Sequence, residues 1–341
     1  MVTATGQIKL LVVDDSLLMQ KVLIDILKVD KQISVVGTAR DGEEALLKIN
    51  SLQPDVVTMD IEMPKMSGLT AVRRIMETTP VPVVMISALT QRTAQLTLKA
   101  LEFGAVDYVP KPSGQISLNM DTVRDELISK IRTAAYANLL SNKTFVNENS
   151  YSPIKTNDKV ISIAASTGGP PAITKILRSL SSDTPPILIV QHMTQGMTKH
   201  FAEGLNDSCK FDVKEAQEGD KVQAGLALIA PSGFHMIITK ERKVHLNMDS
   251  PVNYVRPSAD VLMFSLSEIY GSKNVGVVLT GMGADGAMGI KAIKQKGGVT
   301  IAQDKKTSVV YGMPNVAFQT GCIVTVSPLE MIPKEIMKAC N

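Results

Sequence analysis

Tryptophan is absent from this chain of 341 residues, and Phe, Tyr and Trp together make up only 4% of it. Cysteine is also scarce: Cys209, Cys322 and Cys340 lie far apart and form no C-x-x-C pair, which argues against a disulfide framework and a zinc site. No apolar run reaches the roughly 18 residues of a membrane-spanning helix, and the N-terminus lacks the pattern of a signal peptide. We therefore expect a cytoplasmic protein with no direct membrane insertion.

A strong excess of charge of one sign is missing as well. The 36 basic and 33 acidic residues give a net charge of +3, which does not favour a nucleic acid or membrane surface as partner. At this length two domains are expected, and a content of 44% hydrophobic residues supplies both with a core.

The first 140 residues alternate between strand and helix patterns. Short apolar runs at 8–13, 33–39, 55–60, 81–87 and 107–109 are each followed by a helical pattern, the last over about 121–140. Such alternation predicts a doubly wound α/β domain with a five-stranded parallel sheet of the flavodoxin-like type.

Polar residues follow four of these strands. Asp14 and Asp15 end the first strand, Asp60 the third and Ser87 the fourth, and Lys111 follows the fifth. Because right-handed crossovers place all the strand ends on one edge of the sheet, we expect these side chains to lie together. Crowded carboxylates repel one another, and a hard cation such as Mg²⁺ relieves that repulsion. A phosphoryl group on Asp60 would meet the cation, the lysine ammonium and the serine hydroxyl.

This half resembles a response-regulator receiver domain. The resemblance is carried by the motifs VVDDS (12–16), MDIEMPKMSG (59–68), ISA (86–88) and YVPKP (108–112). It implies that residues 1–140 are a phospho-acceptor domain with Asp60 as the acceptor. It also implies Mg²⁺ bound by Asp15, Asp60 and the Glu62 backbone carbonyl, with Asp14 acting through water.

The same resemblance assigns two further roles. Lys111 would pair with the phosphate, and Ser87 would be the switch hydroxyl. The Lys111–Pro112 bond is a candidate cis peptide. A sensor histidine kinase is the implied phosphoryl donor.

Residues 141–158 lose this periodicity and are rich in Asn, Ser and Thr, which predicts a flexible linker. From residue 159 to 341 the α/β alternation resumes. The runs at 236–239 and 243–247 are typical of a β-hairpin. The second domain is therefore expected to be doubly wound and mainly parallel, with an antiparallel hairpin.

Three residues of the second domain suggest acyl-transfer chemistry. Ser166 follows the strand 160–165, His192 follows the next strand, and Asp285 lies just past a later strand end. If these strands are neighbours, hydroxyl, imidazole and carboxylate converge as nucleophile, base and orienting group. Backbone N–H groups near Thr167 or Met282 are candidates for an oxyanion hole.

The local sequence around Ser166 is also compatible with roles other than that of a nucleophile. The serine can be an ordinary helix N-cap, or Gly168 and Gly169 can form a phosphate cradle at a helix N-terminus. Because His200, His235 and His245 lack the combination of strand end and serine partner, we interpret them as surface or packing histidines.

The GMGADG loop (281–286) supports a competing function. Gly281-x-Gly283-x-x-Gly286 follows a strand and opens a helix, and Asp304 comes 18 residues after Gly286. This spacing matches a dinucleotide-binding fingerprint, although it does not occur in the first βα unit of its domain. A receiver-gated nucleotide- or NAD-binding switch is therefore the alternative function. A receiver-coupled scaffold without catalysis is a third hypothesis, and a DNA-binding output is disfavoured because no basic helix-turn-helix is present.

The second half resembles the catalytic domain of chemotaxis response-regulator protein-glutamate methylesterases. The matching motifs are ASTGGP (165–170), QHM (191–193), RPSADVL (256–262), TGMGADG (280–286), and AQD (302–304) with YGMP (311–314). The family usually has a glycine where this chain has Ala164. Carried over by position, Ser166 is the nucleophile, His192 the general base and acid, and Asp285 its orienting residue.

In this family, Thr167 and Met282 occupy positions around the active site. The resemblance implies a phosphorylation-activated hydrolase of glutamate methyl esters that also deamidates glutamine side chains, with no cofactor for the esterase reaction. Its implied substrate is the cytoplasmic domain of a methyl-accepting chemoreceptor, and its implied process is adaptation in bacterial chemotaxis.

Overall fold

A computed structural model describes residues 6–88, 90–111, 120–139 and 158–341 of the chain. The chain divides into two compact units, residues 1–139 and 140–341. Apart from residue 158, the predicted linker 141–158 lies outside the described residues. Among the described residues, no helix is long and apolar enough to cross a membrane.

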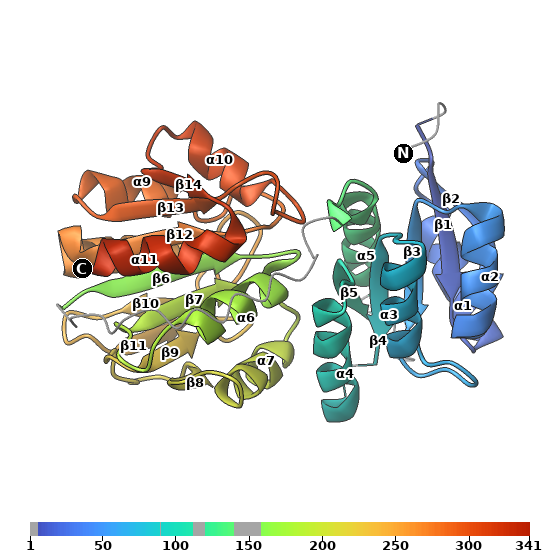
Figure 1. Cartoon of the computed structure of the whole chain (residues 1–341), viewed down its shortest axis with the longest axis horizontal. Coiled ribbons are helices and arrows are strands. Elements are labelled where there is room, and N and C mark those ends of the chain that lie inside the picture. Colours follow the sequence, from blue (N-terminus) through green and yellow to red (C-terminus); the bar gives the residue numbers. More distant parts are fainter. Residues whose placement is uncertain (1–5, 89, 112–119, 140–157) are drawn as a thin grey trace. The chain divides into compact units, whose positions relative to one another are not determined.

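The first unit is a parallel sheet of five strands in the order β2-β1-β3-β4-β5 (Figure 1). Its strands are β1 (Ile8–Val13), β2 (Ile33–Ala39), β3 (Val56–Asp60), β4 (Val83–Ser87) and β5 (Asp107–Pro110). Its helices are α1 (Leu17–Leu27), α2 (Gly42–Leu52), α3 (Gly68–Thr78), α4 (Gln91–Glu102) and α5 (Met120–Ala135). The predicted flavodoxin-like fold is confirmed, although α5 ends before the predicted residue 140.

Helices cover both faces of this sheet, α1 and α5 on one side and α2, α3 and α4 on the other. The central strands β3 and β4 are buried along their whole length, which explains why their sequences are continuous apolar runs instead of alternating ones. All five strands are parallel, so their carboxyl ends share one edge.

The second unit is built on a seven-stranded parallel sheet in the order β14-β13-β12-β6-β7-β9-β8. Its strands are β6 (Val160–Ala165), β7 (Ile187–Gln191), β8 (Asp212–Glu215), β9 (Leu226–Ile229), β12 (Asn274–Val278), β13 (Val299–Gln303) and β14 (Thr325–Ser327). The predicted hairpin forms as a separate antiparallel sheet of β10 (His235–Ile238) and β11 (Val244–Asn247). Strands β8 and β9 belong to the parallel sheet, so among the described residues antiparallel pairing of whole strands occurs in the hairpin, with isolated antiparallel bridges at Lys221–Lys243 and Val252–Val255.

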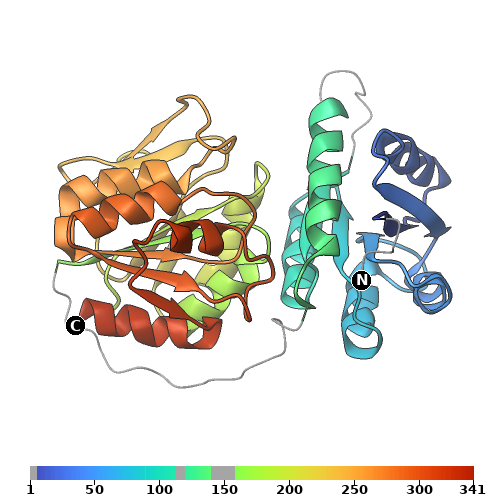
Figure 2. The ribbon, with the colours of Figure 1, turned by 90° about the horizontal axis from the view of Figure 1, so that it is seen from above.

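Its helices lie on both faces of the sheet (Figure 2). They are α6 (Gly169–Ser179), α7 (Met197–Asn206), α8 (Ala259–Tyr270), α9 (Ala287–Gln295), α10 (Met313–Gln319) and α11 (Ile332–Cys340), with the 3₁₀ helices η2 (Gly271–Lys273) and η3 (Leu329–Met331). The sequence patterns did not predict α10 and α11. Both are short and carry a proline in the first turn, a position that starts a helix without breaking it.

Candidate functional site

Ser166 lies at the carboxyl end of β6, the strand between β12 and β7. Its backbone N–H donates to the carbonyl of Thr280 at 3.1 Å, which ties the serine to the loop after β12. Ser166 is half-buried, whereas the whole of β6 before it is buried. The strand order therefore brings the three predicted residues to adjacent strand ends.

His192 follows β7, and its backbone N–H donates to the carbonyl of Ala165 at 3.1 Å. Its imidazole Nε2 lies 2.9 Å from Oδ2 of Asp285. Nδ1 is therefore the ring nitrogen left for the serine hydroxyl. Among the described residues, the hydrogen bonds of His192 include none to Ser166 Oγ. Catalytic hydrogen bonds often form only once substrate is bound, so this geometry fits a resting site.

The Asp285 carboxylate is 2% exposed and surrounded by donors. Besides His192, the Ser258 hydroxyl donates to it at 2.6 Å, as does the Ala259 backbone N–H at 2.6 Å. Burial raises the pKa of Asp285, but the hydrogen bonds from His192, Ser258 and Ala259 outweigh it, so the pKa lies below its usual value. The carboxylate therefore stays ionised, as a partner for an imidazolium must.

Glycine at two positions allows the loops to close around Ser166. Gly168 has a φ of 74°, a left-handed conformation, and a Cβ there would lie 2.6 Å from Val309. A Cβ on Gly281 would lie 2.7 Å from the Ser166 Cβ. Gly168 and Gly281 thus allow close backbone packing around Ser166, the predicted nucleophile.

Gln191 is a site residue that the sequence interpretation missed. It is buried, and its Nε2 donates to the carbonyl of Ser166 at 2.9 Å and to that of His192 at 3.1 Å. One side-chain amide thereby joins the backbones of the predicted nucleophile and base. Its position at a strand end beside His192 was the available signal.

Asn253 and Ser258 were also missed. Ser258 lies within the RPSADVL motif, to which no role was assigned, and Asn253 gives no local signal. The Asn253 amide donates to Asp260 at 2.9 Å and to Asp285 at 3.4 Å. Burial raises the pKa of Asp260, and repulsion by Asp285 adds to that rise.

The two residues proposed for the oxyanion hole differ in exposure. Thr167 is buried, and its carbonyl accepts a hydrogen bond from the Thr280 hydroxyl at 2.9 Å. Met282 lies in the loop after β12 with a side chain 52% exposed. Their role stays a prediction.

The other three histidines lie at the surface or are packed in the interior, as the sequence predicted. His200 and His245 pair with Glu203 and Glu218, both at 3.1 Å. His235 is buried and packs beneath α8, where its Nδ1 accepts the backbone N–H of Ser258 at 3.1 Å.

The dinucleotide-binding alternative is not supported. The amino end of α9, where a pyrophosphate would bind, is occupied by a protein carboxylate, because Gly289 N–H donates to Asp260 at 2.7 Å. The Asp304 carboxylate accepts from the Thr307 backbone and hydroxyl at 2.9 and 2.6 Å. Of the loop glycines, Gly281 packs against Ser166, where an added Cβ would lie 2.7 Å from the serine Cβ.

The first unit gathers a second set of predicted residues. Asp14 and Asp60 are buried at the ends of β1 and β3, and Lys111 Nζ lies 2.9 Å and 2.8 Å from their carboxylates. One carboxylate oxygen from each of Asp14, Asp15 and Asp60 lies within 4.8 Å of the others, and Asp15 is exposed. Three hard oxygen donors at this spacing suit a small divalent cation.

Neighbouring charges at this cluster shift the pKa values of Asp60 and Lys111. Burial alone would lower the pKa of Lys111, but hydrogen bonds to Asp60 and Asp14 outweigh it and hold the pKa above its usual value. Burial raises the pKa of Asp60, repulsion by Asp14 adds to this, and Lys111 opposes it. A cation at the cluster would relieve that repulsion.

Ser87 ends β4 and is fully buried, and its hydroxyl accepts a hydrogen bond from Thr97 on α4 at 2.9 Å. The Glu62 side chain is exposed and lies 3.5 Å from Arg92. The role of the Glu62 carbonyl stays a prediction. The predicted cis bond Lys111–Pro112 involves a residue outside those described.

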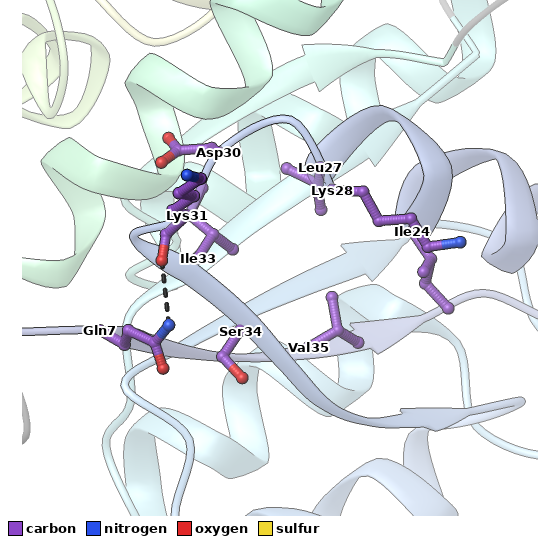
Figure 3. Close-up of a pocket in the computed structure, with 9 residues that line it drawn as sticks. All are labelled: Gln7, Ile24, Leu27, Lys28, Asp30, Lys31, Ile33, Ser34 and Val35. Carbon is purple, nitrogen blue, oxygen red and sulfur yellow. Dashed lines mark hydrogen bonds between the residues drawn. The ribbon is translucent and has the colours of Figure 1, made fainter. Parts of the chain in front are cut away.

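A separate pocket of about 510 Å³ lies in the first unit, between α1 and β2 (Figure 3). Its lining includes Lys28, Asp30 and Val35, and Asp30 forms an ion pair with Arg132 at 2.7 Å. The pocket is at the starting ends of β1 and β2, the edge opposite the carboxylates. It therefore contributes no residue to either site.

Comparison with known proteins identifies both halves. The model of the response regulator receiver domain matches residues 10–121, and that of CheB methylesterase matches residues 161–336. The protein-glutamate methylesterase/protein-glutamine glutaminase of Pyrococcus horikoshii is 48% identical over 344 residues, which cover 98% of this chain and 94% of that protein. The protein of the same name from Symbiobacterium thermophilum is 43% identical over 353 residues, 97% of each chain.

A solved structure agrees. The crystal structure of the Thermotoga maritima CheB methylesterase catalytic domain matches with a TM-score of 0.51 and 40% identity, covering 53% of this chain and 97% of that one. The chain therefore belongs to the CheB methylesterase family of hydrolases and carries a response regulator receiver domain in its first half.

Proposed function

We propose that this protein is a phosphorylation-activated protein-glutamate methylesterase that also deamidates protein glutamine side chains. The observation that carries the proposal is the convergence of Ser166, His192 and Asp285 on three adjacent strand ends, with the imidazole held by the carboxylate at 2.9 Å. The names of the two relatives described above support the two activities. The proposed substrate is the cytoplasmic domain of a methyl-accepting chemoreceptor, and the proposed location of the protein is accordingly the cytoplasm.

The proposed reaction proceeds through an acyl-enzyme. Ser166 Oγ attacks the carbonyl carbon of a glutamate γ-methyl ester while His192 Nδ1 takes the hydroxyl proton. The imidazolium then protonates the departing methoxide, and methanol leaves. A water molecule, deprotonated by the same imidazole, attacks the acyl-enzyme and releases the glutamate carboxyl group and the free serine. A glutamine side chain follows the same course with ammonia as the leaving group.

Asp285 supports these proton transfers by fixing the imidazole and stabilising its charged form. Backbone N–H groups near Thr167 or Met282 would stabilise the oxyanion, and one such donor is typically worth about 3 kcal/mol. No cofactor is needed for these steps.

The receiver half is proposed to control the esterase. Asp60 would accept a phosphoryl group from a sensor histidine kinase, and Lys111 and Ser87 would contact it. Asp14, Asp15, Asp60 and the Glu62 carbonyl would hold Mg²⁺, which supplies charge neutralisation for phosphoryl transfer when bound. The added phosphate carries roughly −1.5 to −2 charges and would bias a two-state receiver surface that restrains the esterase.

The test is release of methanol and ammonia from methylated receptor, measured with and without a small-molecule phosphodonor. We expect wild type to be stimulated by the donor, Asp60→Asn to lose the stimulation, and Ser166→Ala to release neither product. Full methanol release by Ser166→Ala would contradict the esterase assignment. Full stimulation of Asp60→Asn would contradict control through Asp60 alone.

A further inference from the structure

Ser258 occupies the N-cap position of α8 but does not cap its own helix. Serine at this position usually accepts a hydrogen bond from an N–H of the first turn, and here the side chain makes no such bond. Its hydroxyl instead donates to Asp285 Oδ1 at 2.6 Å. Both residues are almost completely buried, Ser258 at 0% and Asp285 at 2% exposure.

The Asp285 carboxylate caps the N-terminus of α8 in place of the Ser258 side chain. The backbone N–H of Ala259 donates to Oδ2 at 2.6 Å, and that of Asp260 donates to Oδ1 at 3.2 Å. A carboxylate at a helix N-terminus is favoured both by these free N–H groups and by the helix dipole. The serine hydroxyl is thus an additional, side-chain donor to Oδ1, while His192 binds Oδ2.

The backbone of Ser258 is in turn held by His235. His235 Nδ1 accepts the Ser258 backbone N–H at 3.1 Å, and His235 Nε2 contacts the Ser250 carbonyl at 3.2 Å. These two bonds require the neutral imidazole with its proton on Nε2. His235 is 1% exposed, so it cannot exchange these partners for water without a local rearrangement.

We propose that Ser258 is a positioning residue for the hydrolytic reaction, fixing the Asp285 carboxylate and through it the His192 ring, and that His235 fixes Ser258 in turn. The proposal rests on the proposed triad. The hydroxyl sets the rotation of the carboxylate about its Cβ–Cγ bond, and that rotation determines where Oδ2 meets the imidazole. Without it, His192 Nδ1 is less well aimed at Ser166.

The first test compares Ser258→Ala with Ser267→Ala in the full chain. Ser267 is a matched control, because it is a buried serine of the same helix whose hydroxyl donates to the Phe264 carbonyl at 2.8 Å. With methylated receptor as substrate, we expect kcat of Ser258→Ala to fall on the order of tenfold with KM changed less than twofold. Ser267→Ala should keep the wild-type kcat. Equal kcat values for the two variants would overturn the proposal.

The pH profile separates positioning from a loss of folded protein. A carboxylate that has lost a donor attracts the imidazolium more strongly, so the acidic limb of kcat/KM for Ser258→Ala should move to higher pH. The position of that limb does not depend on the amount of folded enzyme. If the acidic limb of Ser258→Ala lay at the same pH as that of wild type, this would contradict the proposal that Ser258 acts on His192 through Asp285.

His235 allows a second comparison. His235→Asn keeps an acceptor near the position of Nδ1, whereas His235→Gln keeps a polar group near Nε2 and removes that acceptor. We expect the Asn variant to retain more of the wild-type kcat than the Gln variant, and the reverse order would contradict the assigned role. Ser166→Ala is measured alongside: if it is active, the proposed function fails. If it is inactive while Ser258→Ala matches the Ser267 control, only the present inference fails.

Discussion

His192 Nε2 lies 2.9 Å from Asp285 Oδ2, although 93 residues separate the two positions in the chain. The contact exists because β7 and β12 flank β6, so that the strand ends followed by His192 and Asp285 lie on either side of Ser166. Because Nε2 is bound to the carboxylate, Nδ1 is the ring nitrogen available for the proposed role as base.

Asp285→Asn should remove most of the esterase activity. The amide cannot stabilise an imidazolium and favours the wrong tautomer of His192, for which losses of about 10⁴-fold in kcat are known in such triads. Methanol release from methylated receptor measures this effect. A decrease of less than tenfold would mean that Asp285 does not orient the base.

The stability conferred by Asp285 should depend on pH. Its folded-state pKa lies below its usual value, so its contribution is complete above the unfolded value of about 3.9 and is lost as the pH falls through the folded value. The difference in thermal midpoint between wild type and Asp285→Asn should therefore be largest near neutral pH and shrink below about pH 4. A difference that is constant from pH 7 to pH 3 would contradict this.

Gly169→Ala should damage both the fold and the activity. An added Cβ would collide with Gln191 Oε1, and the same amide holds the carbonyls of Ser166 and His192. Overpacking of this kind typically destabilises by about 1–3 kcal/mol, and displacement of the amide should lower kcat.

Gly204→Ala is its matched control, because Gly204 is exposed on α7 and an added Cβ there meets nothing within 4 Å. That variant should be more stable by about 0.5–1 kcal/mol with kcat unchanged. Urea unfolding measures the stability of both variants, and methanol release measures their kcat. If Gly169→Ala matched Gly204→Ala in both quantities, the proposed collision with Gln191 would be excluded.

Lys111→Met should destabilise the receiver half in a way that Mg²⁺ partly reverses. The substitution leaves the buried carboxylates of Asp14 and Asp60 without the ammonium that lies 2.9 and 2.8 Å away, a change that costs about 3–5 kcal/mol for buried pairs. A divalent cation bound at the same oxygens would restore part of this loss. The thermal midpoint, measured with and without Mg²⁺, should therefore rise more on adding the cation in this variant than in wild type.

Lys65→Met provides the comparison for Lys111. Lys65 pairs with Asp41 at 2.9 Å, but its side chain is 66% exposed, so its removal should change stability much less. An equal response of the two variants to Mg²⁺ would contradict a cation site at the Asp14–Asp60 cluster.

Chelation of divalent cations should separate the two halves of the function. With EDTA present, we expect phosphodonor stimulation of methanol release to disappear and unstimulated release to persist, because no step of the proposed serine chemistry uses a metal ion. A magnesium salt added back in excess should restore the stimulation. Loss of unstimulated release on chelation would contradict a metal-free esterase reaction.

Sequence alone determined the fold class, because continuous apolar runs such as 160–165 are typical of buried parallel strands. The polar residues predicted to act in catalysis or phosphorylation follow such runs directly. The sequence also singled out Ser166, His192 and Asp60, whose positions at strand ends are local features of the chain.

Only the tertiary structure decided the strand order β12-β6-β7, and with it which strand ends meet. That order depends on long-range pairing between strands far apart in the chain, which local periodicity does not encode. For the same reason the sequence left Ser258 and Gln191 without a role and missed the contact of His235 with Ser258. Ser258 bonds to Asp285, Gln191 to Ser166, and neither partner is a neighbour in the chain. The short helices α10 and α11 were missed because a few residues beginning with proline give too little periodicity to be recognised.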